Sequence, residues 1–147
     1  KSGQAKIIGK FKSPFKGTSA CCFVKWNNKI CLAISDFMRT RQTIFIDYKK
    51  SLKEGKIKNS IVFSYTNEGF SQGLEFINGY LFESENKIGK NVINQIDLKL
   101  LKKNKSSFKS TIKQYIEPGW GVEDLAWDGD NLWTSDEKTY QFYKRKL

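Results

Sequence analysis

The chain repeats itself at intervals of roughly 50 residues, and this self-similarity restricts its fold more than any other feature. Three segments align with one another: CCFVKWNNKICLAIS (21–35), SQGLEFINGYLFES (71–84) and VEDLAWDGDNLWTS (122–135). Each has alternating apolar residues on both sides of a turn rich in Asn, Asp or Gly, which is typical of a β-hairpin. Chance alignment is the alternative, and the matched turns and aromatic residues argue against it.

Further strands are expected after each hairpin. Third strands are predicted at 43–50, 92–100 and 139–147, and more polar fourth strands at 56–66 and 108–116. Four strands per repeat of this length are typical of a β-propeller. The sequence therefore predicts a single all-β domain over 1–147 with three four-stranded blades, at about 18–66, 70–116 and 120–147.

The third repeat ends after its third strand, and a strand at about 5–14 is expected to complete it. Three blades are too few for a ring, because propellers have roughly 4–8. We therefore expect a homodimer, in which two chains form a six-bladed ring and each N-terminal strand completes the last blade of the other. Residues 1–35 carry seven lysines and no acid, whereas 117–137 carry seven acids and no lysine or arginine. These segments either attract each other across the dimer or are two separate solvated faces.

The chain has a net charge of +11, from 26 basic and 15 acidic residues. All but three of the basic residues are lysines, scattered between apolar positions, which favours a solvated surface over specific nucleic-acid recognition. Apolar runs of four or five residues predict no membrane span. With no histidine and no metal-type cysteine spacing, neither a metal nor a cofactor is expected. A carboxylate, lysine, cysteine or tyrosine must then carry any proton transfer.

The cysteines leave two alternatives. Cys31 either forms a disulfide with Cys21 or Cys22, or all three are buried free thiols, which we prefer. The sequence begins at Lys1 without a methionine, as expected of a processed or trimmed product. Removal of a signal peptide is one route to such a start, and an extracytoplasmic location, secreted or periplasmic, is favoured.

The hairpin FSQGLEFINGYLFES (70–84) closely resembles a motif of the plant and bacterial glutamine cyclotransferase family, which reads F-T-Q-G-L, a short turn, and L-[YF]-E-S. These enzymes are five- to six-bladed propellers that convert N-terminal glutamine to pyroglutamate. The resemblance covers about residues 65–137. It implies that Phe70 and Gln72 bind substrate, and that the chain binds a peptide or a small molecule.

The same resemblance places a catalytic glutamate at Glu123, within GWGVEDLAWDG (119–129). The family has glycine where this chain has Asp124, and a tryptophan where it has Glu137. Trp120, in a loop between two glycines, is expected to form a wall of the substrate pocket. Cys22 precedes its apolar column by two residues, as Gln72 and Glu123 precede theirs, so these three are expected to converge near a channel mouth.

Each candidate also has a structural interpretation. Phe70, Trp127 and Trp133 fit packing between blades, and Glu83 fits a surface acid. Functionally, a half-length, non-catalytic binding module is favoured, because the chain departs from the family at two positions and has half its length. The alternative is a glutaminyl-peptide cyclotransferase in which Glu123 transfers the proton, and Gln72 and Asp124 are expected to bind the substrate. A polyanion or membrane-surface binder is a third hypothesis.

Overall fold

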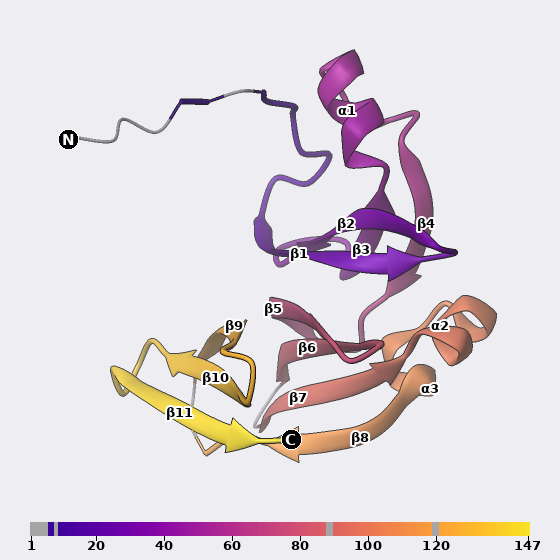
Figure 1. Cartoon of the computed structure of the whole chain (residues 1–147). Coiled ribbons are helices and arrows are strands. Elements are labelled where there is room, and N and C mark those ends of the chain that lie inside the picture. Colours follow the sequence, from indigo (N-terminus) through magenta and orange to yellow (C-terminus); the bar gives the residue numbers. More distant parts are fainter. Residues whose placement is uncertain (1–5, 8, 88–89, 119–120) are drawn as a thin grey trace.

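The structure is a computed structural model that describes residues 6–7, 9–87, 90–118 and 121–147. Three antiparallel sheets make up most of this part of the chain (Figure 1). The first sheet contains, in spatial order, β1 (Thr18–Trp26), β2 (Lys29–Asp36), β3 (Gln42–Ile46) and β4 (Ile61–Thr66). The second contains β5 (Phe70–Ile77), β6 (Tyr80–Lys87), β7 (Lys90–Asp97) and β8 (Thr111–Ile116). The third has three strands, β9 (Val122–Trp127), β10 (Asn131–Asp136) and β11 (Gln141–Lys146).

The three hairpins form where the repeat predicts them. Asn27 and Asn28 both have positive φ, as do Asn78 and Gly79, which is the backbone conformation of a two-residue hairpin turn. The third hairpin has a longer turn, in which the Asp128 carboxylate accepts hydrogen bonds from the next strand. The predicted all-β class with four, four and three strands is therefore correct, and the arrangement fits a propeller-like description without closing into a ring.

Three short helices interrupt the predicted strands. α1 (Tyr48–Glu54) replaces the end of the expected strand 43–50, and α2 (Leu98–Asn104) replaces the end of 92–100. α3 (Ser107–Ser110) shortens the expected fourth strand. The reason is capping: Asp47 and Asp97 each accept a backbone hydrogen bond from the first turn of the helix that follows.

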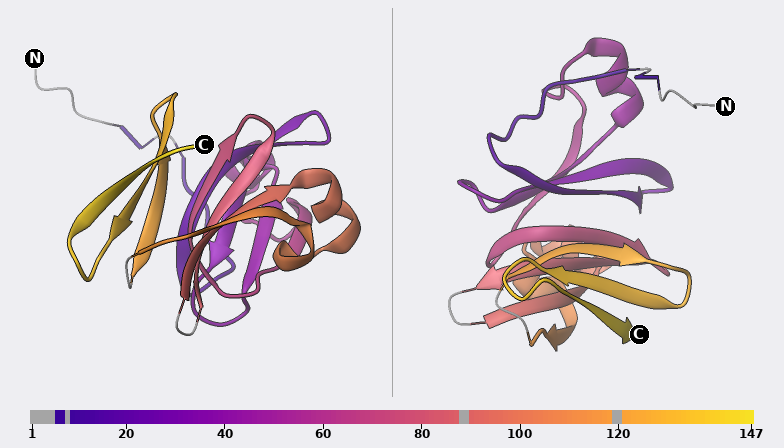
Figure 2. Two further views of the ribbon diagram at one scale, coloured as in Figure 1. Left: turned by 90° about the horizontal axis from the view of Figure 1, so that it is seen from below. Right: turned by 90° about the vertical axis from the view of Figure 1, so that its left-hand side faces the viewer.

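Apolar layers between the sheets hold them together. A cluster that includes Val24, Phe45, Leu74 and Leu81 fills the space between the first and second sheets. A second cluster, with Phe82, Ile93, Leu125 and Leu132, lies between the second and third. Each fully buried side chain of this size contributes about 1.5–3 kcal/mol relative to exposure. These two clusters place the second sheet between the first and the third (Figure 2).

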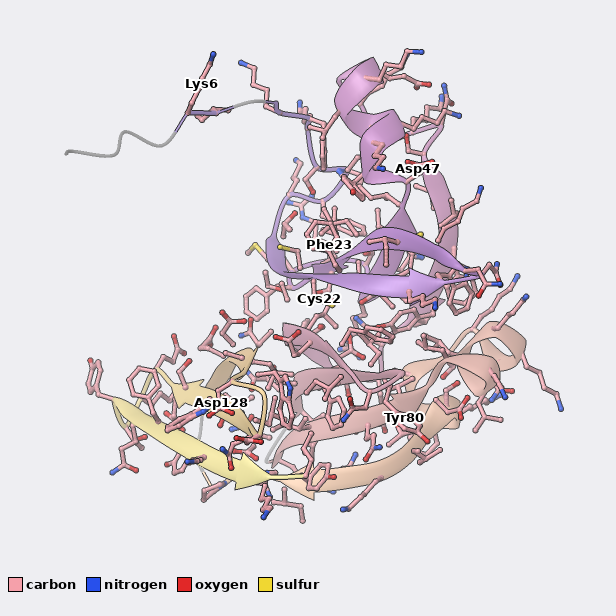
Figure 3. The ribbon with its side chains drawn as sticks, in the orientation of Figure 1. Lys6, Cys22, Phe23, Asp47, Tyr80 and Asp128 are labelled. Atoms are coloured by element: carbon pink, nitrogen blue, oxygen red, sulfur yellow. The ribbon has the colours of Figure 1, made fainter. Side chains whose placement is uncertain are left out.

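The N-terminal segment forms no strand within the described residues 6–7 and 9–14, so the strand expected at about 5–14 is absent from this part of the chain. Phe11 and Phe15 pack on the outer side of the first sheet, and Lys12 forms an isolated parallel bridge with Lys56. Lys6 lies beyond this anchor, away from the sheets (Figure 3). The segment leaves the third sheet of its own chain with three strands.

Candidate functional site

The first strand of each sheet is irregular near its start, and these strands, called the inner strands below, are β1, β5 and β9. Ser19 is an extra residue between the paired positions Thr18 and Ala20, and Gln72 is an extra residue between Ser71 and Gly73. In the third sheet, two residues of β9, at 123–124, face a single residue of β10. Bulges of this kind redirect side chains and are frequent beside active sites. The three sheets thus present their irregular strand ends at one end of the molecule.

Gln72 and Glu123 meet across two of these bulges. The amide nitrogen of Gln72 donates to Oε1 of Glu123 at 3.2 Å, although the two residues lie 51 positions apart. Beside them, the hydroxyl of Ser84 donates to the backbone carbonyl of Glu123 at 2.9 Å. Gln72 is buried and Glu123 is partly buried. The structure therefore brings together the glutamine and the glutamate that the sequence singles out.

Gly73 permits this close approach. A Cβ atom at this position would lie 2.8 Å from the carbonyl oxygen of Glu123 and 2.8 Å from the backbone nitrogen of Leu125. Backbone atoms cannot move aside as a flexible side chain would, so only glycine fits here. The glycine of the Gln72-Gly73 pair thus sets the distance between the second and third sheets at the site.

Acidic residues surround Glu123 and change its proton affinity. Burial raises the pKa of the Glu123 carboxyl, and the charges of Glu137, Asp124 and Asp136 raise it further. The Asp136 carboxylate also accepts the backbone N–H groups of Lys138 and Thr139, which holds the turn after β10. A carboxyl whose pKa moves toward neutrality is suited to exchanging a proton with a ligand.

A shallow cleft of about 210 Å³ adjoins Glu123. Carboxylates of three residues and two aromatic side chains contribute to its wall, which is formed by Glu123, Ser135, Asp136, Glu137, Tyr140, Gln141 and Phe142. Tyr140 and Phe142 are exposed. The cleft is smaller than the 300–1,000 Å³ typical of pockets for drug-sized ligands, so it fits about one residue or a small amine.

The other predicted residues lie in different surroundings. Phe70 packs edge-on against Phe37 in the loop between β2 and β3, with the Arg41 guanidinium 4.8 Å from its ring centre. Asp124 is exposed, and its side chain accepts the N–H of Leu125. Trp120 lies outside the described residues.

Cys22 does not occupy the position that corresponds to Gln72. It pairs with Ala33 within the regular part of β1 and packs on the core between the first and second sheets (Figure 3). The strand register instead makes Ser19 the counterpart of Gln72. The Ser19 hydroxyl donates to the backbone carbonyl of Ser71 at 2.6 Å, so this bulge also contacts the next sheet. All three cysteines are free thiols, but Cys21 is exposed, contrary to the expectation that all are buried.

The expected interblade packing holds for two of three aromatic residues. Phe70 lies between the first and second sheets, and Trp127 packs on the apolar cluster between the second and third. Trp133 is different, because its indole nitrogen donates to Asp128 in the turn and its ring lies 5.3 Å from the Lys144 ammonium. It is half-buried on the outer side of the third sheet.

Two buried glutamates form a cluster that the sequence interpretation missed. Glu83, expected to be a surface acid, is fully buried, as is Glu85. Thr43 and Tyr65 of the first sheet each donate to Oε1 of Glu83 at 3.4 Å, and Oε2 has no hydrogen-bond partner among the described residues. Glu85 accepts hydrogen bonds from Asn94 and Ser107 and lies 3.5 Å from the Lys87 ammonium. Burial raises the pKa of Glu83 well above its usual value, and the Glu85 charge adds to this effect.

A recurring sequence pair marks the strand ends that face the bulges. A serine followed by an acid lies at or near the end of the second strand of every sheet, at 35–36, 84–85 and 135–136, and all three acids are buried. Alignment of these pairs indicates a shared structural position. It does not show that the acids are buried, because burial depends on the neighbouring sheet.

Known proteins give no further assignment: a scan against protein-family models finds no match, and a search of curated proteins returns none either. The resemblance to glutamine cyclotransferases thus remains a prediction from the motif. Among the described residues, no helix is long and apolar enough to cross a membrane. Within the same part of the chain, no three Asp, Glu, Cys or His side chains are grouped so as to hold a metal ion.

Proposed function

We propose that the chain is a propeller-like binding module that takes an amine-bearing peptide or small molecule in the cleft beside Glu123. The hydrogen bond from Gln72 to Glu123 carries this proposal, because it joins two bulged inner strands at the rim of the cleft. Such a junction holds the side chains of a site in place before a ligand arrives, which lowers the entropic cost of binding.

Charge supports an amine as the recognised group. Several carboxylates lie close to Glu123. Burial raises the pKa of Glu123, and the charges of Glu137, Asp124 and Asp136 raise it further. A bound ammonium would relieve their mutual repulsion. The exposed rings of Tyr140 and Phe142 offer faces for a cation–π contact.

Glutaminyl-peptide cyclisation is the second candidate, and the raised pKa of Glu123 favours it. In this reaction the α-amine of an N-terminal glutamine attacks the carbon of its own side-chain amide. A C–N bond forms, the bond to the amide nitrogen breaks, and ammonia leaves. Glu123 would take the proton from the amine and deliver it to the departing nitrogen.

The acidic surroundings place binding ahead of catalysis. Nearby carboxylates favour the protonated form of an amine, and an ammonium has no lone pair with which to attack. Glu137, at the position where the family has tryptophan, adds to this effect. The site therefore supports recognition of a cation better than activation of a nucleophile.

One experiment separates the two candidates. A peptide with free N-terminal glutamine and its N-acetylated form are titrated into the protein and followed by NMR, and each mixture is then analysed for loss of ammonia by mass spectrometry. The binding module predicts that the free peptide binds about tenfold more tightly, the effect of one charge-assisted hydrogen bond. Glu123→Gln should remove this preference, whereas Glu54→Gln, on the exposed side of α1, should retain it.

The outcomes are distinct. Binding without ammonia release supports the module, and ammonia release that Glu123→Gln abolishes supports the cyclotransferase. Equal affinity for the free and acetylated peptides, without turnover, refutes both candidates.

We also propose that two copies of the chain form one six-bladed ring. The first two sheets have four strands and the third has three, so β11 has an edge where a further strand could pair. Phe11 and Phe15 anchor the N-terminal segment on the first sheet, while Ile7 beyond them is exposed. The lysines of 1–35 complement the acids of 117–137.

The mass in solution tests the ring. Light scattering should give twice the chain mass of 17.0 kDa, and deletion of residues 1–10 should give the monomer. High salt should weaken the dimer, because it screens the charges of the two segments. A full-length protein that remains monomeric at high concentration refutes this proposal.

A further inference from the structure

A surface at the outer edge of the second sheet combines exposed apolar side chains with lysines. We define the α2–α3–β8 edge by Leu100, Phe108 and Ile112, which are 40%, 63% and 49% exposed. Phe108 and Ile112 line a shallow hollow of about 260 Å³ together with Lys113. α2, α3 and β8 follow one another along this side of the molecule (Figure 1).

Local structure turns these side chains outward. Leu98 and Leu101 of α2 pack on the core between the first and second sheets, so Leu100 lies on the other side of the helix. In the α3 turn, Ser107 and Ser110 are buried, and Phe108 is exposed. The chain thus buries the small polar residues here and exposes the large apolar ones, the reverse of ordinary burial.

Lysines dominate the charge around these side chains, and the Asp97 carboxylate that caps α2 is an acid beside Leu100. Residues 98–116 contain six lysines and no acid. Within the described part of the chain, no carboxylate forms an ion pair with any of the six, which are Lys99, Lys102, Lys103, Lys105, Lys109 and Lys113. A partner for this edge must supply negative charge and also accept apolar side chains.

We infer that the α2–α3–β8 edge docks on the surface of an anionic lipid bilayer. A bilayer interface meets both requirements, because apolar side chains enter between the headgroups while lysine ammoniums stay at the level of the phosphates. Each lysine near such a surface contributes about 1 kcal/mol. Single-stranded nucleic acid fits less well, since it uses several aromatic rings as stacking platforms and this edge offers only Phe108. This inference does not depend on the proposed ligand site.

Vesicle binding by the whole chain tests the inference. The protein is mixed with sedimentable vesicles of phosphatidylcholine alone or of phosphatidylcholine mixed with phosphatidylserine, and the bound fraction is measured. We expect binding only with phosphatidylserine. Lys103→Glu with Lys109→Glu should weaken binding at least about 30-fold, which corresponds to two lysine contacts.

Two comparison variants make the result specific. The double substitution Lys138→Glu with Lys146→Glu changes the net charge by the same amount, in the β10–β11 turn and on β11, and should leave binding within about threefold of the original. Phe108→Ser with Ile112→Ser keeps every charge and should still weaken binding about tenfold or more, because the inserted apolar area is lost. All these residues are exposed, and circular dichroism checks that each variant is folded.

Three results would overturn the inference. The first is an equal loss in the two charge-reversed variants, which would reflect net charge alone. The second is full binding by the serine variant together with equally strong binding of RNA, which would reveal a general polyanion surface. The third is absence of binding to phosphatidylserine vesicles.

Discussion

Replacing Glu83 by glutamine should remove a pH dependence from the stability of the protein. The Glu83 side chain is fully buried between the first and second sheets, where Tyr65 and Thr43 donate to one oxygen. Burial and the neighbouring Glu85 charge raise its pKa well above the usual value. The folded protein therefore keeps the Glu83 proton over a pH range in which the unfolded chain has lost it.

The sign and size follow from proton linkage. Above the unfolded pKa of about 4.3, the native state binds one proton more than the unfolded state at this site. The free energy of unfolding consequently falls by about 1.4 kcal/mol per pH unit, until the pH passes the folded pKa of Glu83. Glutamine has no proton to lose, so Glu83→Gln should lack this decline.

Urea unfolding followed by tryptophan fluorescence at pH 5, 6 and 7 measures the effect. The difference in unfolding free energy, variant minus original, should rise with pH above about 4.3, by at most about 1.4 kcal/mol per pH unit, until the pH passes the folded pKa of Glu83. Titrating groups that do not interact with Glu83 cancel in this difference, and so does any constant change caused by the amide. Glu54→Gln, on the exposed surface of α1, is the control and should follow the original protein. Parallel curves for Glu83→Gln and the original protein would refute the argument that Glu83 is buried with its proton.

Three further outcomes are expected. Gly73→Ala should lower the unfolding free energy by about 1–3 kcal/mol, because its Cβ would clash with the backbone of β9. Ala126→Ser, on the exposed side of β9, should change the unfolding free energy little, and equal effects of the two substitutions would refute the close approach. Iodoacetamide at pH 8 should label the exposed Cys21 before Cys22, whose thiol pKa is raised by burial, and peptide mapping showing the opposite order would contradict the burial. Asp97→Ala should cost about 1 kcal/mol in urea unfolding, since it removes the N-cap of α2; unchanged stability would show that the cap is dispensable.

The sequence determines the local architecture of this protein. Alternating apolar residues around Asn78-Gly79 specify a hairpin, because the turn residues adopt positive φ and the alternation places one set of side chains on each face. The same pattern, repeated along the chain, predicts three sheets in sequence order. The resemblance of the 70–84 hairpin to the glutamine cyclotransferase motif singles out Gln72 and Glu123, which the structure joins by a hydrogen bond.

The sequence leaves other features open, because their signals are weak or have two meanings. Asp47 and Asp97 end strands and begin helices, and a strand pattern followed by lysines and leucines fits either continuation. Cys22 aligns with Gln72 by counting residues, yet the regular part of the strand between turn and bulge is longer in β1, residues 20–26, than in β5, residues 73–77. Alternating apolar residues do not show where a bulge interrupts a strand, so counting cannot detect this difference.

Only the tertiary structure decides which face of β6 is buried and which sheet covers it. Leu81, Glu83 and Glu85 alternate along β6 and therefore lie on one side of it, a relation fixed by the strand itself. The first sheet covers that side, which buries both acids and changes the proton affinity of Glu83. Strand periodicity sets which side chains share a face, whereas their solvation depends on the segment that packs against that face from elsewhere in the chain.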